Sequence, residues 1–282
     1  LRKAGYVEGR NLIIERRYAE GQVQLVPGYA RELASMNLDA VISTCTPTTR
    51  VARQAVGSTP GSTPIIMAAV ADPVGQQLIA SLARPGANVT GLASQAEDIM
   101  PKMLELFAAV LPKPAAVAVL VDSGSAVHPR MWRALGPIGQ RLNIQLVKVE
   151  AGRKPGDASL SAAFEAAVRQ RATGIFVLPD EPFFVAKRGD IVALAAQHRL
   201  PAFYGLREYV DEGGLMSYGE SMRRAYRSLA TYIDKVAAGG DPGVMPVSQP
   251  TQFELVINQK TAKALGLALP QSILLSANEV IQ

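Results

Sequence analysis

The sequence predicts an α/β protein of two doubly wound (Rossmann-like) lobes, in which each sheet is covered by helices on both faces. Three observations lead to this prediction. Short apolar runs of strand length alternate with segments whose apolar residues recur at helical spacing. The alternation restarts after Arg84-Pro85-Gly86, and 282 residues are more than one hydrophobic core usually serves. Aromatic residues make up only 6% of the chain, while alanine, valine and leucine dominate, as suits helices packed on sheets.

The first ninety or so residues are predicted to form most of the first lobe. The stretch at 11–18 is predicted to form a strand, and the apolar residues Leu25, Tyr29, Leu33 and Met36 then recur at helical spacing. Asp72 followed by Pro73 is typical of a helix start and predicts a helix from there to residue 82. The other elements expected here are strands at 39–43, 64–69 and 88–93, and helices at 24–37 and 44–56.

The second half of the chain repeats the alternation of strands and helices. Strands are predicted at 115–121, 144–149, 174–178, 201–204 and 215–218. Helices are predicted at 98–110, 129–142, 158–171 and 183–198, with a helical turn at 206–212. A long apolar stripe predicts a helix at 222–236, followed by an extended segment at 247–253 and a short helix at 258–265. These last elements cannot form a third domain, so the chain is expected to cross between the lobes more than once.

Composition and charge exclude several classes of protein. The net charge is +5 and the pI about 9.4, but the basic residues are scattered singly or in pairs such as Arg16-Arg17, so no nucleic-acid partner is expected. No apolar run is long enough to cross a bilayer. A single cysteine excludes an internal disulfide framework. The sequence begins without Met or a signal peptide, so any export signal is expected upstream of it.

An enzymatic function has little support in the sequence. Cys45 could act as a nucleophile, but His128 and His198 lie in helical stretches of the other lobe, with nothing to orient them. The chain contains none of the motifs G-x-S-x-G, G-x-G-x-x-G or G-x-x-x-x-G-K-[ST]. Two isolated histidines and one cysteine do not form a metal site. No catalytic residue, cofactor or metal is therefore predicted.

The stretch from Leu200 to Gly219 contains two predicted strands, each ending in tyrosine followed by glycine. Ligands of open α/β sheets bind at the carboxyl ends of the strands, so Tyr204 and Tyr218 are candidates for ligand contact. A tyrosine offers a flat apolar face and one hydroxyl group, which suits packing against a small molecule. The alternative is that both are tyrosines of the core or of an interface.

Two polar segments follow strands of the first lobe. Thr46, Thr48 and Thr49 lie where a strand passes into a helix, and free backbone N–H groups and hydroxyls there favour an anionic group such as a carboxylate. Simple helix capping is the alternative, although it needs only one threonine. Asp72 follows the next strand, and its role is either that of a helix N-cap or that of a partner for a ligand amine.

The second lobe has acids at the corresponding strand ends. Asp122 and Ser123 follow one strand, and Asp180 follows another. An ammonium group buried with a ligand requires a carboxylate partner, and Asp180 is the first choice for it, with Asp122 second. The alternative is that both are solvated loop acids. Phe183 is a candidate for lining an apolar pocket, although it or its neighbour Phe184 is also expected in the helix core.

Several longer stretches resemble one known family, the tryptophan/tyrosine-type substrate-binding proteins of ABC transporters, which have the type I periplasmic binding protein fold. They are GYVEGRNLIIE, ADPVG, SLARPGANVTGL, LPAFYGLREYVDEGGLMSYG and QPTQFELVINQKTAKALGL, at 5–15, 71–75, 81–92, 200–219 and 249–267. The resemblance covers nearly the whole chain. In this family a strand and most of a helix precede the first of these stretches, so the first strand of the first lobe is apparently missing here.

The resemblance implies two lobes joined by three crossovers, with the ligand between them. The lobes would comprise residues 1–91 with 219–248, and 92–218 with 249–282. It also implies a monomeric, periplasmic or lipid-anchored protein that closes on a small ligand and delivers it to a membrane permease. The ligand is expected to be an amino acid, aromatic or branched. Alternatives are the ligand-sensing domain of a receptor or regulator with the same fold, and an α/β isomerase or lyase.

Overall fold

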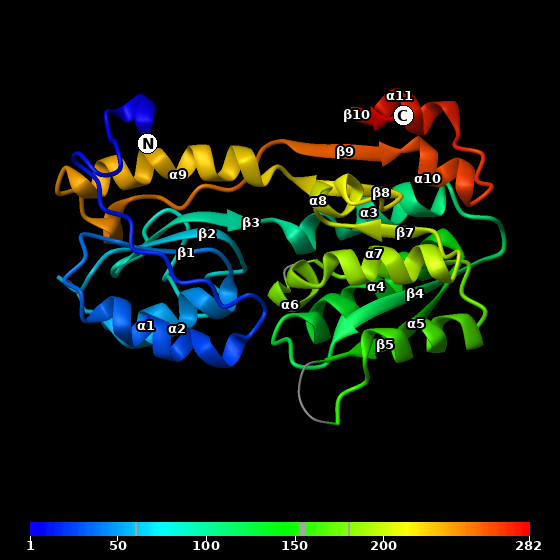
Figure 1. Ribbon diagram of the computed structural model, residues 1–282, viewed down its shortest axis with the longest axis horizontal. Coiled ribbons are helices and arrows are strands. Elements are labelled where there is room, and N and C mark those ends of the chain that lie inside the picture. Colours follow the sequence, from blue (N-terminus) through cyan, green and yellow to red (C-terminus); the bar gives the residue numbers. More distant parts are fainter. Residues whose placement is uncertain (60, 153–155, 180) are drawn as a thin grey trace. The chain divides into compact units, whose positions relative to one another are not determined.

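The computed structural model describes residues 1–59, 61–152, 156–179 and 181–282 of the chain. The chain folds into two units (Figure 1). Unit 1 consists of residues 1–95 and 222–251, and unit 2 of residues 96–221 and 252–282. The chain therefore passes from one unit to the other three times, after residues 95, 221 and 251.

Unit 1 contains a three-stranded parallel sheet in the order β1-β2-β3. Its strands are β1 (Val41–Ser43), β2 (Ile65–Ala71) and β3 (Val89–Ser94). Its helices are α1 (Val26–Ala34), α2 (Thr46–Val56) and α9 (Met222–Ala237), with short 3-10 turns at Arg2–Ala4, Val23–Leu25 and Pro242–Val244. Because side chains alternate along a strand, Ile65 and Met67 pack with Ala52 of α2, while Ile66 packs with Leu229 of α9. The two sides of the sheet therefore have separate cores (Figure 1).

Two elements predicted in unit 1 are wrong. Residues 11–18 form no strand, because a strand needs a neighbour to pair with, and among the described residues only the isolated bridge between Glu8 and Leu12 forms here. The predicted helix after Asp72 is a turn instead. Asp72 and Gln77 adopt positive φ angles of 40° and 56°, and the N–H of Leu78 donates to the carbonyl of Pro73. Such a left-handed residue and bond close a helix after a single turn.

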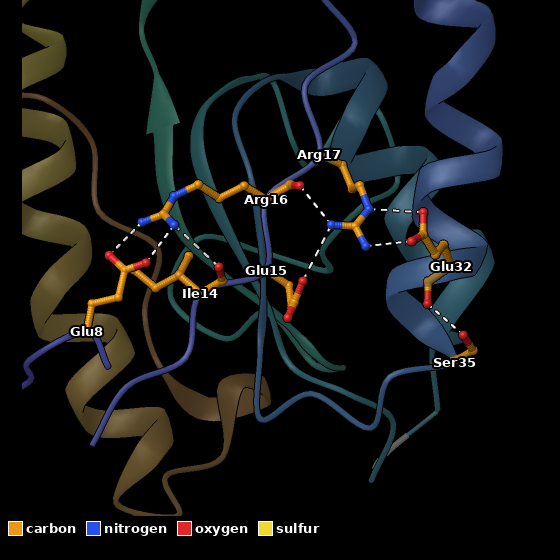
Figure 2. A network of polar contacts seen from close by, with 7 residues as sticks. All are labelled: Glu8, Ile14, Glu15, Arg16, Arg17, Glu32 and Ser35. Carbon is orange, nitrogen blue, oxygen red and sulfur yellow. Dashed lines mark hydrogen bonds and ion pairs between the residues drawn. The ribbon is translucent and has the colours of Figure 1, made fainter. Parts of the chain in front are cut away.

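The extended segment before α1 is fixed by ion pairs (Figure 2). Arg16 donates to both carboxylate oxygens of Glu8, at 2.6 and 2.8 Å, and lowers the pKa of that carboxyl. Arg17 points the other way, toward Glu32 of α1, with its Nε at 3.0 Å from Oε2, and lowers the pKa of Glu32. Exposed pairs of this kind add little stability singly, so their main effect is to set the path of the segment.

Unit 2 contains a seven-stranded sheet in the order β10-β9-β8-β7-β6-β4-β5. All neighbours pair in parallel except β8 and β9, which are antiparallel. The strands are β4 (Ala115–Asp122), β5 (Ile144–Ala151), β6 (Gly174–Val177), β7 (Ala202–Tyr204), β8 (Met216–Glu220), β9 (Phe253–Asn258) and β10 (Glu279–Ile281). The helices are α3 (Ala96–Ala108), α4 (His128–Leu142), α5 (Leu160–Arg169), α6 (Pro182–Ala186), α7 (Arg188–Gln197), α8 (Arg207–Asp211), α10 (Gln259–Ala264) and α11 (Gln271–Ser276).

The two faces of this sheet also form separate cores. On β4, Val117, Val119 and Val121 pack with α3 and α4, whereas Ala118 and Leu120 pack with α5 and α7. Helices thus cover both faces, as the sequence predicts for a doubly wound lobe.

Three details of unit 2 differ from the sequence-based expectation. The helix predicted at 183–198 is two helices, α6 and α7, because Lys187 adopts φ −102° and ψ 17° between them. The sequence predicts an extended segment at 247–253 and a helix from 258. In the structure, strand β9 begins at Phe253, continues to Asn258 and pairs with β8. The tail, for which no element was predicted, contains α11 and β10.

Strand β1 lies at an edge of its sheet and has an exposed apolar residue. Among the strands that the structure describes, it pairs with β2 alone. Ile42 is 46% exposed, whereas the residues beside it on the neighbouring strands, Ile66 of β2 and Thr90 of β3, are fully buried. An exposed apolar edge strand is a site at which protein molecules self-associate.

We therefore expect Ile42→Lys to reduce self-association at little cost in stability. The change in the free energy of unfolding should stay within about 0.5 kcal/mol, as for other surface substitutions. Light scattering and thermal unfolding measure the two effects. The matched control is Ile66→Lys, which buries an unpaired charge on the neighbouring strand and should lower the melting temperature strongly. Equal destabilisation by the two substitutions would contradict this account of β1.

Candidate functional site

The residues predicted to contact a ligand follow the carboxyl ends of strands in both units. Parallel strands end at the same edge of a sheet, so the polar groups after them gather there. In unit 1 this edge carries the segments after β1 and β2, and in unit 2 the segments after β4, β6, β7 and β8.

The three threonines at the start of α2 are all hydrogen bonded within unit 1. Thr46 is 3% exposed, and its Oγ1 accepts the N–H of Ala71 at the end of β2, at 3.2 Å. Thr48 Oγ1 accepts the N–H of Cys45, the N-cap of α2, at 3.2 Å. Thr49 is fully buried, and its hydroxyl lies 2.6 Å from that of Ser43. The hydroxyl groups thus fix the loop between β1 and α2 and tie it to β2.

Asp72 is used in the turn after β2. Its Oδ1 accepts the N–H of Gly75 at 2.9 Å. A Cβ atom at position 75 would lie 1.9 Å from Asp72 Oδ2, so a side chain there would displace the Asp72 carboxylate. The half-buried carboxylate therefore has a structural role here, and a contact with a ligand amine stays a prediction.

His128 links two strand ends of unit 2. Its ring is fully buried, and Nδ1 accepts the N–H of Asp122 at 2.9 Å. Nε2 lies 3.0 Å from the carbonyl oxygen of Pro179. A ring nitrogen that accepts a bond has no proton, so the ring is neutral and Nε2 donates to Pro179. The sequence showed this residue only as a histidine without catalytic partners, and its spacing gave no sign of the link.

Of the two acids predicted for the ammonium group, Asp122 lies within the described residues. Asp122 is 1% exposed, and its Oδ1 accepts the N–H of Gly124 at 2.8 Å, which holds the loop after β4. Ser123 is exposed, and its N–H donates to the carbonyl of Ala151 at the end of β5. Asp180, the first choice, lies outside the described residues.

Phe183 and Tyr204 pack in the core of unit 2. Phe183 is 9% exposed, with its ring 5.6 Å from that of Phe184. Tyr204 is fully buried and stacks on Tyr209 of α8 at 4.5 Å, and burial raises the pKa of its hydroxyl far above the usual range. Both residues thus have structural roles, and ligand contact by either stays a prediction.

The glycines that follow the two tyrosines have a structural explanation. A Cβ atom at Gly219 would lie 1.9 Å from the carbonyl oxygen of Gly205, and one at Gly205 would lie 2.8 Å from Pro179. The backbone of β8 therefore approaches the residue after β7 too closely for a side chain at 219, and the residue after β7 approaches Pro179, after β6, too closely for a side chain at 205. The repeated Tyr-Gly pattern reflects these two close approaches.

Tyr218 differs from Tyr204 because it is only half-buried. Its ring lies 5.8 Å from that of Phe253 on β9. Glu220 is the last residue of β8, two positions further on, and pairs with Phe253 in the antiparallel register. Burial raises the pKa of the Glu220 carboxyl to about 7. Neither Glu220 nor Phe253 was predicted to contact a ligand. The sequence could have indicated Glu220, because it lies two residues after Tyr218 and side chains two apart on a strand leave the same face.

The raised pKa of Glu220 predicts a pH-dependent stability. A carboxyl group in an unfolded chain has a pKa of about 4.3, so between about pH 4 and 7 the folded protein retains a proton that the unfolded chain has lost. Stability is then lost as the pH rises through this window, and no more is lost above it. Glu220→Gln cannot ionise, so its melting temperature should exceed that of the wild type at pH 8 and equal it near pH 4.5. Calorimetry at both pH values tests this, and an identical difference at each would contradict it.

No helix in the described part of the chain has the length and apolar character needed to cross a membrane. Within the same ranges, no group of three or more His, Cys, Asp or Glu side chains is placed to hold a metal ion.

Comparisons with known proteins agree with the fold. The chain is 26% identical over 269 residues to a tyrosine-binding protein of Clostridioides difficile (strain R20291), covering 95% of this chain and 74% of that protein. The crystal structure of a conserved domain protein from Vibrio cholerae is 28% identical, with a TM-score of 0.87 over 99% of this chain and 90% of that one.

A second solved structure, an ABC domain from Streptococcus pneumoniae in complex with L-Trp, has a TM-score of 0.86. It is 23% identical and covers 99% of this chain and 91% of its own, which shows likeness of fold. The α/β fold predicted from the sequence is confirmed by these structures. The family model described as ABC transporter substrate binding protein matches residues 1–281. The chain therefore belongs to the family of ABC transporter substrate-binding proteins.

Proposed function

We propose that this protein binds one free amino acid with an aromatic side chain and delivers it to the permease of an ABC importer. The observation that carries the proposal is the agreement between family and relatives. The family binds transport substrates, one relative is named for tyrosine, and one protein of similar fold is described in complex with L-Trp. The protein would act outside the cytoplasm, in the periplasm or on a lipid anchor, as a monomer.

The chemistry of the two sheet edges suits an amino acid. A zwitterion needs donors for its carboxylate and an acid for its ammonium group. In unit 1, α2 begins with the segment from Cys45 to Thr49, and a helix start favours a negative charge. In unit 2, acids follow the strand ends, among them Asp122. Asp180 remains a predicted partner of the ammonium group.

In this proposal the ligand acts on an equilibrium between open and closed forms. Contacts from unit 1 and unit 2 would be made together only in the closed form, so binding would shift the population toward it. The permease would then distinguish the closed form from the open one. A ligand that reached one unit alone would not shift this equilibrium.

The proposal predicts selective binding of aromatic amino acids by the purified protein. L-Tyr and L-Trp should bind in titration calorimetry, whereas L-Lys and L-Asp should not. A ligand at 100 times its Kd stabilises the folded protein by about 2.7 kcal/mol, so a thermal shift provides a second readout. Analogues without the ammonium or the carboxylate group are the controls and should bind much more weakly. If no free amino acid binds, or if a bound one is chemically converted, the proposal is wrong.

A further inference from the structure

The face of the sheet that carries Tyr218 also carries Glu220 and Phe253. Residues 218 and 220 are two apart on β8, so their side chains leave the same face. Tyr218 pairs with Leu255 and Glu220 with Phe253, which puts the half-buried Phe253 on that face as well. The rings of Tyr218 and Phe253 lie 5.8 Å apart at an interplanar angle of 37°. An acid therefore adjoins an aromatic pair where β8 ends.

The carboxylate of Glu220 is half-buried and has no counter-charge among the described residues. Strands β7 and β9 and helices α3 and α8 pack against β8. Their titratable and charged residues are Tyr204, Glu254, Glu97, Asp98, Lys102, Glu105, Arg207, Glu208, Tyr209 and Asp211. Arg207 is paired with Asp211 and Glu279, while Glu97 and Glu105 are paired with Arg130 and Arg141. Within the described parts of the chain, Glu220 forms no hydrogen bond or ion pair with any of them.

A cation is the group that this arrangement favours. A partly buried carboxylate without a partner is costly, and a cationic group from outside would remove that cost. The faces of aromatic rings also attract cations. An anion would instead meet a like charge, and a neutral apolar group would bury the carboxylate further.

We propose that Glu220 binds the ammonium group of the ligand, and that Tyr218 and Phe253 form the aromatic wall of the same subsite. This inference rests on the proposed amino-acid binding and assigns the ammonium group to a residue other than Asp180 or Asp122. Glu254 provides a matched comparison. It is also half-buried on the same pair of strands, but it pairs with Gly219, so its side chain leaves the opposite face.

The first experiment compares Glu220→Gln with Glu254→Gln by titration calorimetry with L-tyrosine at pH 8. Glu220→Gln should weaken binding about 100-fold, the scale for loss of one partner of a desolvated charge pair. Glu254→Gln should change the affinity by less than about threefold. The second ligand is 3-(4-hydroxyphenyl)propanoate, which lacks the ammonium group. It should bind the wild type and Glu220→Gln equally weakly, because the interaction removed by the substitution is already absent.

A second measurement needs no variant. A cation beside Glu220 favours its ionised form, so wild-type protein should release a fraction of a proton on binding L-tyrosine at pH 7. Calorimetry in phosphate and in Tris, whose ionisation enthalpies differ, measures this release. The affinity should rise as the pH rises through about 7.

The outcomes separate the two proposals. If the wild type binds L-tyrosine but Glu220→Gln binds it within threefold as tightly, the assignment of Glu220 is wrong and the proposed function stands. The assignment of Glu220 is also wrong if Asp180→Asn weakens the binding of L-tyrosine and Glu220→Gln does not. It is wrong as well if the wild type binds L-tyrosine at pH 7 without releasing a proton. If the wild type binds neither L-tyrosine nor L-tryptophan, the proposed function itself is wrong.

Discussion

Parallel strand pairing is the constraint on which both units depend. It requires a crossover connection between neighbouring strands, usually through a helix, and it brings the carboxyl ends of parallel strands to one edge of a sheet. The three parallel strands of unit 1 and the parallel run from β8 to β5 in unit 2 both follow it. The polar groups that could meet a ligand are therefore collected by the topology, although they are far apart in the sequence.

Most of the polar groups at these edges hold the edges themselves in place. His128 joins the ends of β4 and β6 through one donated and one accepted bond, and Thr46 joins α2 to the end of β2. Gly219 lets β8 approach the backbone after β7, and Gly205 lets that backbone approach Pro179 after β6. A binding edge must be rigid before it can be selective, so these bonds stabilise the edge even where no ligand contacts them. Glu220 takes part in none of these bonds.

The sequence predicted the strands and helices well wherever an element carried its own pattern. The apolar runs of β2, β4 and β6 and the stripes of α3, α4 and α9 were all placed within a few residues. The predictions were wrong where an element depends on contacts with another part of the chain. Residues 11–18 were predicted to form a strand, but no described strand lies beside them to pair with, and β9 is a strand because β8 lies beside it. At Asp72 the capping pattern was real, but a positive φ at Gln77 closed the helix after one turn.

The sequence by itself determined the α/β class, the family and the strand ends at which candidate residues lie, because periodicity, caps and longer motifs are local properties. Only the tertiary structure decided what each candidate side chain touches. It buried Tyr204 against Tyr209, gave hydrogen-bond partners to three threonines, and left the carboxylate of Glu220 half-buried beside two rings. Burial and pairing depend on residues distant in the chain, and no local pattern encodes those contacts.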